Sequence, residues 1–218
     1  MKSIVLFSIV LSGLLLSSNG DSLECSHSKP SIPEDWIDMA PTCTEVMKKH
    51  IQAELNASMQ YLAMAAHFSQ DSVNRPGFAK MFFQSASEER DHAIKLISYL
   101  IMRGELTQDI SQMIKKNTVV TKTEWASGVE ALKQALVMEA NVTAAIRRVI
   151  KQCEDSDDKH DSAKKFNDYH LVDYLTADFL EEQYRGQKEI ASRISNLEKL
   201  MNMHGDLGEF LFDKKLLQ

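Results

Sequence analysis

The stretch SASEERDHAIKL, residues 85–96, decides the fold, because its apolar residues recur at helical spacing while charged residues interrupt the same stripe. Steps of three and four along the surrounding segment give the seam Phe78, Phe82, Ser85, Glu89, His92, Leu96 and Tyr99. Such a seam is the face that a helix buries against its neighbours. Glu89 and His92 therefore occupy positions where a helix normally places apolar side chains. The stretch predicts a buried helix that carries a polar function.

Three further segments share this spacing, and together the four segments cover most of the chain. They span about residues 44–71, 77–104, 124–152 and 162–201. No strand-like alternation of apolar and polar residues competes with them. The sequence therefore predicts an all-α fold, with a four-helix bundle over residues 44–203.

The connections predict how these helices run. The breaker SVNRPG at residues 72–77 is short, so the first two helices should be antiparallel neighbours. About 19 residues, ELTQDISQMIKKNTVVTKT, join the second helix to the third, which exceeds an ordinary turn. A linker of this length can cross the bundle and bring the third helix parallel to the second. The charged loop CEDSDDKHDS at residues 153–162 predicts a solvated turn.

The two ends of the chain differ from the bundle. Residues 21–43 form a polar extension that carries prolines and two cysteines. After a break at Gly205, the pattern resumes as a short amphipathic helix within residues 204–218. A helix this short is marginal alone, so it should need a partner surface.

The first 20 residues, MKSIVLFSIVLSGLLLSSNG, indicate a secretory signal peptide that is cut near Gly20. Its apolar run, residues 4–16, is too short to span a bilayer, so we expect secretion and no membrane anchor. The net charge of −6 at pH 7 and the pI near 5.7 disfavour a nucleic-acid surface, which normally shows a basic excess. An acidic balance instead suits the binding of cations.

Secretion changes the interpretation of the three cysteines, Cys25, Cys43 and Cys153, because thiols pair in oxidising compartments. An odd number leaves at least one thiol free or bonded to another subunit. All three are disulfide candidates, and their connectivity stays open. Two sequons, at Asn56 and Asn141, fall inside predicted packed helices, so we expect them to be mostly unused for glycosylation.

The other three helices also carry polar residues on their seams. The first seam is Met47, Ile51, Glu54, Ser58, Tyr61, Ala65 and Phe68; the third is Val129, Leu132, Leu136, Glu139, Thr143, Ile146 and Ile150; the fourth is Phe179, Gln183, Gly186, Ile190 and Leu197. Glu182 lies beside the fourth seam. Any one buried carboxylate is more often a satisfied core residue than a ligand.

Three seam carboxylates are harder to explain as core residues, because Glu54, Glu89 and Glu139 come from different helices at similar heights. Burying them uncompensated is costly, so they need cations, protons or basic partners. The seams offer no Lys or Arg at that level. Carboxylates with one imidazole form a donor set suited to iron. The sequence therefore predicts a metal site, in which Glu89 and His92 can reach the same ion or neighbouring ions.

From about residue 44 to the C-terminus the chain resembles the ferritin family. The resemblance rests on ELNASMQYLAM (54–64), SEERDHAIKL (87–96), WASGVEALKQALVMEANV (125–142), LEEQ (180–183) and GEFLFDKKL (208–216). The signal peptide and the cysteine-bearing extension are similar to those of secreted, insect-type heavy-chain homologues. The resemblance implies a ferritin-like bundle whose short fifth helix packs at a symmetry axis of a hollow shell.

The resemblance also implies a di-iron ferroxidase centre in which every position is filled. Glu54 and His92 match the glutamate and the histidine of the first iron site. Glu89 matches the glutamate that bridges the two irons. Glu139 matches the glutamate of the second site, and Gln183 matches the glutamine that hydrogen-bonds there.

Other positions matched by the resemblance lie beside or beyond the two irons. Tyr61 matches the tyrosine near the centre, where tuning or shuttling electrons and plain packing are both open roles. Glu88 matches an inner glutamate that passes iron onward. Asp173 matches the aspartate of the family's three-fold iron channel, but Thr176 stands in place of the channel's glutamate.

Two departures from related patterns bear on how iron is held. Arg185 follows Glu182 at the spacing where di-iron oxygenases and bacterioferritins have a histidine. The second iron is then held by carboxylates and binds more weakly, which suits a site that oxidises iron and releases it. In the expected cavity lining, Asp91 shortens a common glutamate and Ile94 replaces another, so we expect mineral nucleation to fall largely to a partner chain.

The resemblance thus implies iron storage with ferroxidase activity. Fe(II) and dioxygen are the expected substrates, and Fe(III) collects as a ferric mineral core. The family builds shells of about 24 subunits, and we expect a mixed, disulfide-linked shell with a light-chain homologue. Two alternatives are a structural shell subunit with a slow metal site and a di-iron oxygenase that acts on an organic substrate. The acidic charge disfavours a DNA-protecting mini-ferritin.

Overall fold

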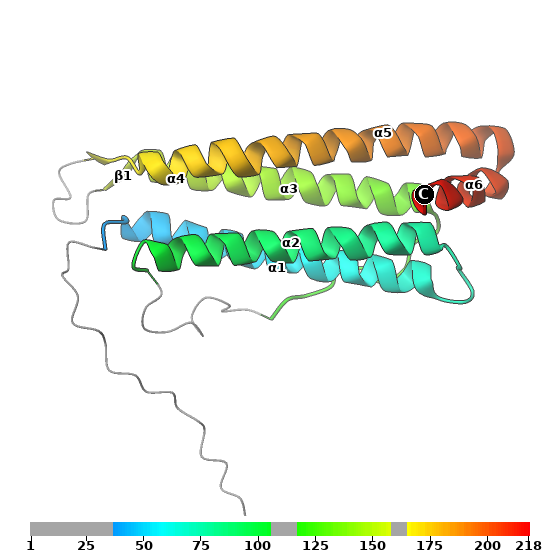
Figure 1. The fold of residues 1–218 in the computed structure, drawn as a ribbon, viewed down its shortest axis with the longest axis horizontal. Coiled ribbons are helices and arrows are strands. Elements are labelled where there is room, and N and C mark those ends of the chain that lie inside the picture. Colours follow the sequence, from blue (N-terminus) through cyan, green and yellow to red (C-terminus); the bar gives the residue numbers. More distant parts are fainter. Residues whose placement is uncertain (1–36, 106–116, 158–164) are drawn as a thin grey trace, which may run out of the picture. The chain divides into compact units, whose positions relative to one another are not determined.

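A computed structural model describes residues 37–105, 117–157 and 165–218, all within one compact unit (Figure 1). The predicted signal peptide, Cys25 and most of the extension lie outside the described residues. The long helices are α1 Pro41–Ser69, α2 Pro76–Met102, α3 Gly128–Glu154 and α5 Glu181–His204. Shorter elements are α4 Tyr169–Tyr174, the π-helical segment η3 Leu175–Leu180, α6 Asp206–Leu216, and the strands β1 Ser156–Asp157 and β2 Lys165–Phe166. Within these ranges, no helix is both long and apolar enough to cross a membrane.

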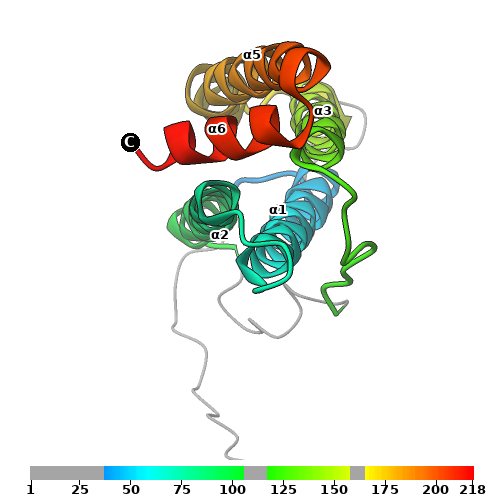
Figure 2. The ribbon, with the colours of Figure 1, turned by 90° about the vertical axis from the view of Figure 1, so that its right-hand side faces the viewer.

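The predicted four-helix bundle is confirmed, with α4, η3 and α5 following one another as its fourth helix. Helix α1 packs against α2 and α3, and α3 packs against α5. Figure 2 shows the long helices from one end, with α6 lying across that end. Helices α2 and α3 both begin next to α6, so they run parallel, as the long crossover predicts (Figure 1).

Three helix starts differ from the prediction. Helix α1 begins at Pro41, which places Cys43 in its first turn rather than in the extension; proline is favoured there because its missing N–H has no helical partner. Helix α3 begins at Gly128 rather than near 124, because the side chain of Ser127 caps it. Helix α4 begins at Tyr169 rather than near 162. A short antiparallel pair joins β1, in the loop predicted as a turn at residues 153–162, to β2, in the stretch predicted as the start of the fourth helix.

The described part of the crossover is anchored to α1 by two buried side chains. Gln60 accepts a hydrogen bond from the Thr121 N–H at 2.9 Å and donates one to the Lys122 carbonyl at 2.6 Å. His67 Nε2 lies 2.9 Å from the Trp125 carbonyl. These contacts satisfy irregular backbone that would otherwise pack against the bundle without partners. They hold the segment that leads into α3 along α1.

Helix α6 is held by its own chain. The Phe78 N–H at the start of α2 donates to Asp213 Oδ1 at 3.0 Å, and the Gly128 N–H at the start of α3 donates to Glu209 Oε2 at 2.9 Å. Carboxylates at helix N-termini pair with unsatisfied N–H groups and with the positive end of the helix dipole. The short helix therefore finds its partner surface within this chain. Its exposed apolar residues are Leu207, Phe210 and Leu211.

Two apolar clusters fill the bundle core, one on either side of a polar band. The first includes Met47, Ile51, Leu96, Tyr99 and Ile146; the second includes Tyr61, Phe68, Phe78, Phe82 and Leu132. Predicted seam residues supply both clusters, which confirms the helical spacing, although six seam residues are only half-buried: Ser85, Val129, Leu136, Ile150, Gly186 and Ile190. Between the clusters along each helix lie the buried residues Glu54, Glu89, His92 and Glu139.

Cys43 and Cys153 form a disulfide that joins the start of α1 to the end of α3 across 110 residues of sequence. Both cysteines are completely buried. Two of the three disulfide candidates are thus paired within the chain, so Cys153 is not a free thiol. Cys25 remains the candidate for a bond to another subunit.

Candidate metal centre

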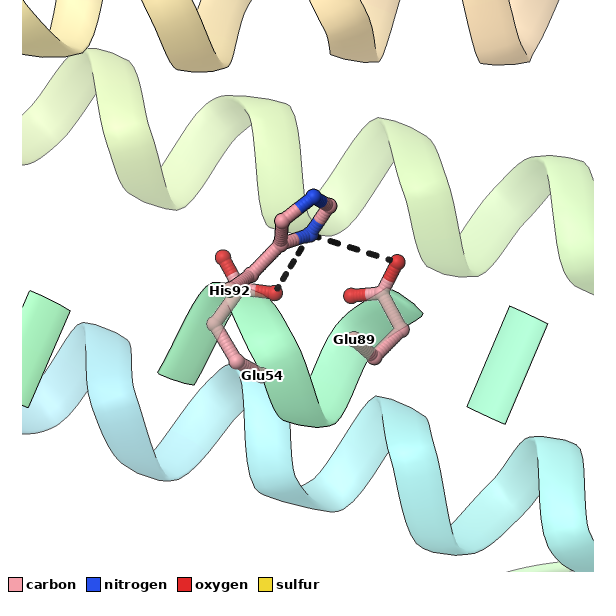
Figure 3. A group of neighbouring side chains, drawn as sticks. All are labelled: Glu54, Glu89 and His92. Carbon is pink, nitrogen blue, oxygen red and sulfur yellow. Dashed lines mark ion pairs between the residues drawn. The ribbon is translucent and has the colours of Figure 1, made fainter. Parts of the chain in front are cut away.

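Three predicted ligands come together in the polar band. Glu54 on α1 and Glu89 and His92 on α2 each offer one donor atom, and these atoms all lie within 4.8 Å of one another. His92 Nδ1 is 4.0 Å from Glu54 Oε2 and 3.8 Å from Glu89 Oε1; Figure 3 marks both pairs with dashed lines. Because Glu89 and His92 are three residues apart, one helical face presents both toward α1. The three donors therefore surround a common point.

Several buried polar atoms of these three residues have no hydrogen-bond partner in the part of the chain that the structure describes. Both oxygens of Glu54, Oε2 of Glu89 and Nδ1 of His92 are buried and unpartnered within the described part of the chain. Buried polar atoms in native proteins are normally satisfied, and unsatisfied ones indicate a bound ion, a water or a functional role. Carboxylate oxygens with one imidazole nitrogen fit Fe(II) or a similar divalent cation. The residues present thus fit the predicted metal.

The two ring nitrogens of His92 face different partners. Nδ1 faces Glu54 and Glu89, while Nε2 lies 3.3 Å from Oε1 of Glu182, a side chain that is 54% exposed. A metal-binding histidine typically donates its second N–H to a carboxylate, which sets the tautomer and the ring orientation. Glu182, which lies beside the predicted seam, is placed to accept a hydrogen bond from the Nε2–H of His92.

Burial changes the acid–base behaviour of the centre. It raises the pKa of Glu89 to about 8 and that of Glu139 to about 7, and it also raises the pKa of Glu54. For His92, burial is the largest single influence and lowers the pKa, but the carboxylates of Glu89, Glu54 and Glu182 together outweigh it and raise the pKa to about 9. In the absence of a cation, protons therefore neutralise part of the cluster.

The second half of the predicted centre involves Glu139 on α3 and Gln183 on α5. The Tyr61 hydroxyl donates a short hydrogen bond to Glu139 Oε1. Burial raises the pKa of Tyr61 well above its ordinary value, so the phenol stays protonated and remains a donor. Thr143 donates to Gln183 Oε1 at 3.0 Å, which orients the amide. All six predicted centre residues are buried.

A cavity of about 290 Å³ joins the buried centre to solvent-exposed residues. Its inner wall includes Tyr61, Glu89, His92, Glu139 and Gln183, and its outer wall includes Glu88, Glu182, Glu189 and Arg193. Glu88 is exposed and accepts a hydrogen bond from Gln84 at 3.0 Å. An ion that leaves the centre through this cavity would meet carboxylates along the way.

Other predicted site residues lie away from this cavity. Asp173 is exposed on α4, and Thr176 is exposed on η3. Asp91 and Ile94, predicted to line the inner cavity of a shell, are exposed on α2 in the single chain. Both sequons lie in helices as expected, although Asn56 and Asn141 are themselves exposed in the single chain.

Sequence reasoning missed His50, which is buried one turn before Glu54 on α1. Its Nε2 lies 3.0 Å from Glu54 Oε1. Burial lowers the pKa of His50 to about 4, so this imidazole is neutral near pH 7. The sequence did contain a signal: residues four apart are neighbours on a helix, so His50 had to lie close to Glu54. His50 was overlooked because it is not itself on the predicted seam.

The raised carboxyl pKa values predict a pH-dependent metal affinity. Protons on Glu89, Glu139 and His92 must leave before a divalent cation binds, and with pKa values of about 8, about 7 and about 9 they are lost more readily as the pH rises from 6 to 8. Zn²⁺, which dioxygen does not oxidise, should therefore bind at least about tenfold more tightly at pH 8 than at pH 6. Calorimetry in buffers of different protonation enthalpy measures both the affinity and the released protons. An affinity that is flat with pH, with no proton release, would contradict the prediction.

Comparisons with known proteins agree on one family. A family model for the ferritin-like domain matches residues 44–200. The ferritin heavy chain of Trichoplusia ni is 55% identical over 218 residues, covering 100% of this chain and 98% of that protein. The ferritin heavy chain of Drosophila melanogaster is 49% identical over 209 residues, covering 96% and 97%. The ferritin middle subunit of Salmo salar is 36% identical over 177 residues, covering 80% and 91%.

A solved structure gives the same result at the level of the fold. The crystal structure of Trichoplusia ni secreted ferritin is 58% identical, with a TM-score of 0.80, and the match covers 89% of this chain and 97% of that one. The region matched by the family model includes all six buried residues of the predicted centre. The chain belongs to the ferritin family.

Proposed function

We propose that this chain is an iron-storage subunit with ferroxidase activity, which oxidises Fe(II) with dioxygen and passes Fe(III) to a mineral core. The observation that carries the proposal is the buried group Glu54, Glu89 and His92, whose donor atoms lie within 4.8 Å of one another and in which each residue has a buried polar atom without a hydrogen-bond partner among the described residues. A purely structural core would satisfy these atoms with other side chains or replace them with apolar residues. The heavy-chain names of the relatives agree with the proposal.

Two iron positions share the centre. The first takes one oxygen from each of Glu54 and Glu89 and Nδ1 of His92. The second takes Glu89 and Glu139, and Gln183 contributes a hydrogen bond there. Glu89 is thus common to both positions, which brings two iron ions close enough to react with one dioxygen molecule.

The chain's residues bind the substrate and favour its oxidised form. Each Fe(II) loses one electron, and dioxygen accepts both electrons with two protons from solvent and leaves as hydrogen peroxide. Anionic carboxylate oxygens are hard donors, so they stabilise Fe(III) relative to Fe(II). Tyr61 donates its hydrogen bond to Glu139 and keeps that carboxylate oriented. The cavity with exposed Glu88 at its outer wall offers the product a way out of the centre.

Storage of a mineral needs a hollow assembly. The crystal structure of a secreted ferritin from Trichoplusia ni supports export of this chain by its predicted signal peptide. We propose a mixed shell of about 24 subunits with a light-chain homologue, in which closed symmetry encloses the mineral.

Cys25 is the proposed link between unlike subunits, because Cys43 and Cys153 are bonded to each other. Non-reducing gels of co-expressed subunits should show a linked pair that Cys25→Ser abolishes.

Rapid-mixing kinetics of Fe(II) oxidation test the proposal. Aerobic additions of increasing Fe(II) to the assembled protein should give a fast phase that saturates at about two Fe(II) per subunit, because the centre holds a metal pair. Oxygen consumption measured in parallel should follow the same phase. A structural shell subunit would show only slow oxidation without this saturation point, and that result would overturn the proposal.

A further inference from the structure

A buried imidazole lies directly behind the metal centre. His50 and Glu54 are both on α1, one helical turn apart, and neither side chain has any exposed surface. His50 Nε2 is 3.0 Å from Glu54 Oε1, yet no nitrogen of His50 makes a hydrogen bond within the described residues. Burying a neutral imidazole without a hydrogen-bond partner costs free energy. His50 therefore needs a nearby oxygen that can accept a hydrogen bond from it in another state of the site.

The two oxygens of Glu54 face different groups. Oε2 lies toward His92 Nδ1, at 4.0 Å, on the side where the three ligand atoms converge. Oε1 lies toward His50. When Oε2 binds a metal ion, the carboxylate is ionised and Oε1 is a buried anionic acceptor that needs a donor.

We propose that His50 is a positioning residue: when metal binds, its Nε2–H donates to Glu54 Oε1 and holds Oε2 toward the first iron position. The inference rests on the proposed function only in that Glu54 must bind metal. Hydrogen bonds of this kind are often poorly aligned without the ligand and tighten when it binds. Ligating carboxylates are commonly oriented by such outer partners.

The geometry favours positioning over direct ligation. The group of donor atoms within 4.8 Å of one another consists of Glu54, Glu89 and His92, and it does not extend to His50 in the described part of the chain. His50 approaches the centre through the oxygen of Glu54 that faces away from His92. It therefore acts on the metal through Glu54.

Two substitutions at His50 distinguish a hydrogen-bond donor from a side chain that only fills space in the core. His50→Leu keeps bulk but removes the N–H, whereas His50→Gln keeps an N–H donor on a flexible side chain. The matched control is His67→Leu, which removes another buried imidazole of α1, one that contacts the Trp125 carbonyl instead of a ligand. Circular dichroism and particle size establish that each variant folds and assembles.

Anaerobic calorimetry with Fe(II) and with Zn²⁺ on the assembled protein provides the first readout. His50→Leu should weaken the tighter of the two positions by about 10- to 100-fold, the range for loss of an outer partner. His50→Gln should bind within about threefold of wild type, and so should His67→Leu, because neither loses the donor to Glu54. Wild-type affinity in His50→Leu, equal weakening in His50→Gln, or equal weakening in His67→Leu would each overturn the proposal.

Pulsed electron paramagnetic resonance with Cu²⁺ as the probe provides the second readout. One directly coordinated imidazole, that of His92, is expected in wild type and in His50→Leu. Two imidazoles in wild type that fall to one in His50→Leu would make His50 a ligand and overturn its positioning role. If wild type binds none of these metals at the centre, the proposed function itself fails; if wild type binds and His50→Leu binds equally, only the role of His50 fails.

Discussion

Replacing Glu89 by alanine is expected to slow the fast phase of Fe(II) oxidation by at least about 100-fold. Loss of a residue that only hydrogen-bonds to a metal ligand already lowers metal affinity or activity by up to about 100-fold, and Glu89 is a proposed ligand of both irons. The side chain is buried between α1 and α3, and its donor atom belongs to the group with Glu54 and His92. Alanine removes the shared donor, so two iron ions are no longer held side by side. Rapid-mixing absorbance and oxygen uptake, with about two Fe(II) per subunit, measure the change.

Stability should not explain this loss. Burial raises the pKa of Glu89 to about 8, which means that the ionised carboxylate is disfavoured in the metal-free fold. The metal-free Glu89→Ala variant should therefore melt at a temperature close to that of wild type or above it at pH 8. Glu124→Ala, which removes an exposed carboxylate before α3, is the matched control and should oxidise Fe(II) at the wild-type rate. Equal rates in wild type and Glu89→Ala would reject the ferroxidase proposal.

Removing the disulfide should have the largest effect on stability. The bond between Cys43 and Cys153 closes a loop of 110 residues, and loop-closure entropy for that length corresponds to about 5 kcal/mol. The double replacement Cys43→Ala and Cys153→Ala should lower the free energy of unfolding by about that amount. For a domain of this size the midpoint of thermal unfolding would fall by about 10–20 °C.

Scanning calorimetry of the assembled protein at a fixed concentration and scan rate measures this shift. Both cysteines are replaced together because a single replacement leaves a buried free thiol and mixes two effects. Glu124→Ala, which removes an exposed carboxylate before the start of α3, is the control and should melt at the wild-type temperature. A double variant that melts within about 2 °C of wild type would show that the bond adds little to a bundle already held by packing.

The fold could be predicted largely from apolar spacing. Helical steps from Glu89 and His92 place Phe82 and Leu96 on the same seam, and both are buried as that spacing requires. The length of the linker between α2 and α3 predicts that these helices run parallel. The chain leaves α2 at one end of the bundle and must travel back to the end where α2 began, which needs many residues. Local periodicity and connection length are properties of the sequence alone.

The centre was predictable for a related reason. Charged residues on a buried stripe are costly, so Glu54, Glu89 and Glu139 stand out as exceptions on their own helices. The structure brings Glu54, Glu89 and His92 to one point and bonds Tyr61 to Glu139.

Other features depend on residues that are far apart in the chain. The pairing of Cys43 with Cys153 requires the end of α3 to lie beside the start of α1, and the spacing of three cysteines does not specify this. Asp213 and Glu209 look like ordinary helix charges in the sequence, yet they accept hydrogen bonds from the starts of α2 and α3. Each of these contacts is decided by where a distant helix begins or ends.

The sequence by itself determined the class of fold, the long helices and the polar residues that break their seams, because burial and periodicity act within each helix. Tertiary structure alone decided which cysteines pair and how α6 is held against the start of α2. The physical reason is distance: a disulfide, a cap or a hydrogen bond forms only between atoms within a few ångströms. For residues more than 100 positions apart, such proximity exists only after the helices have packed.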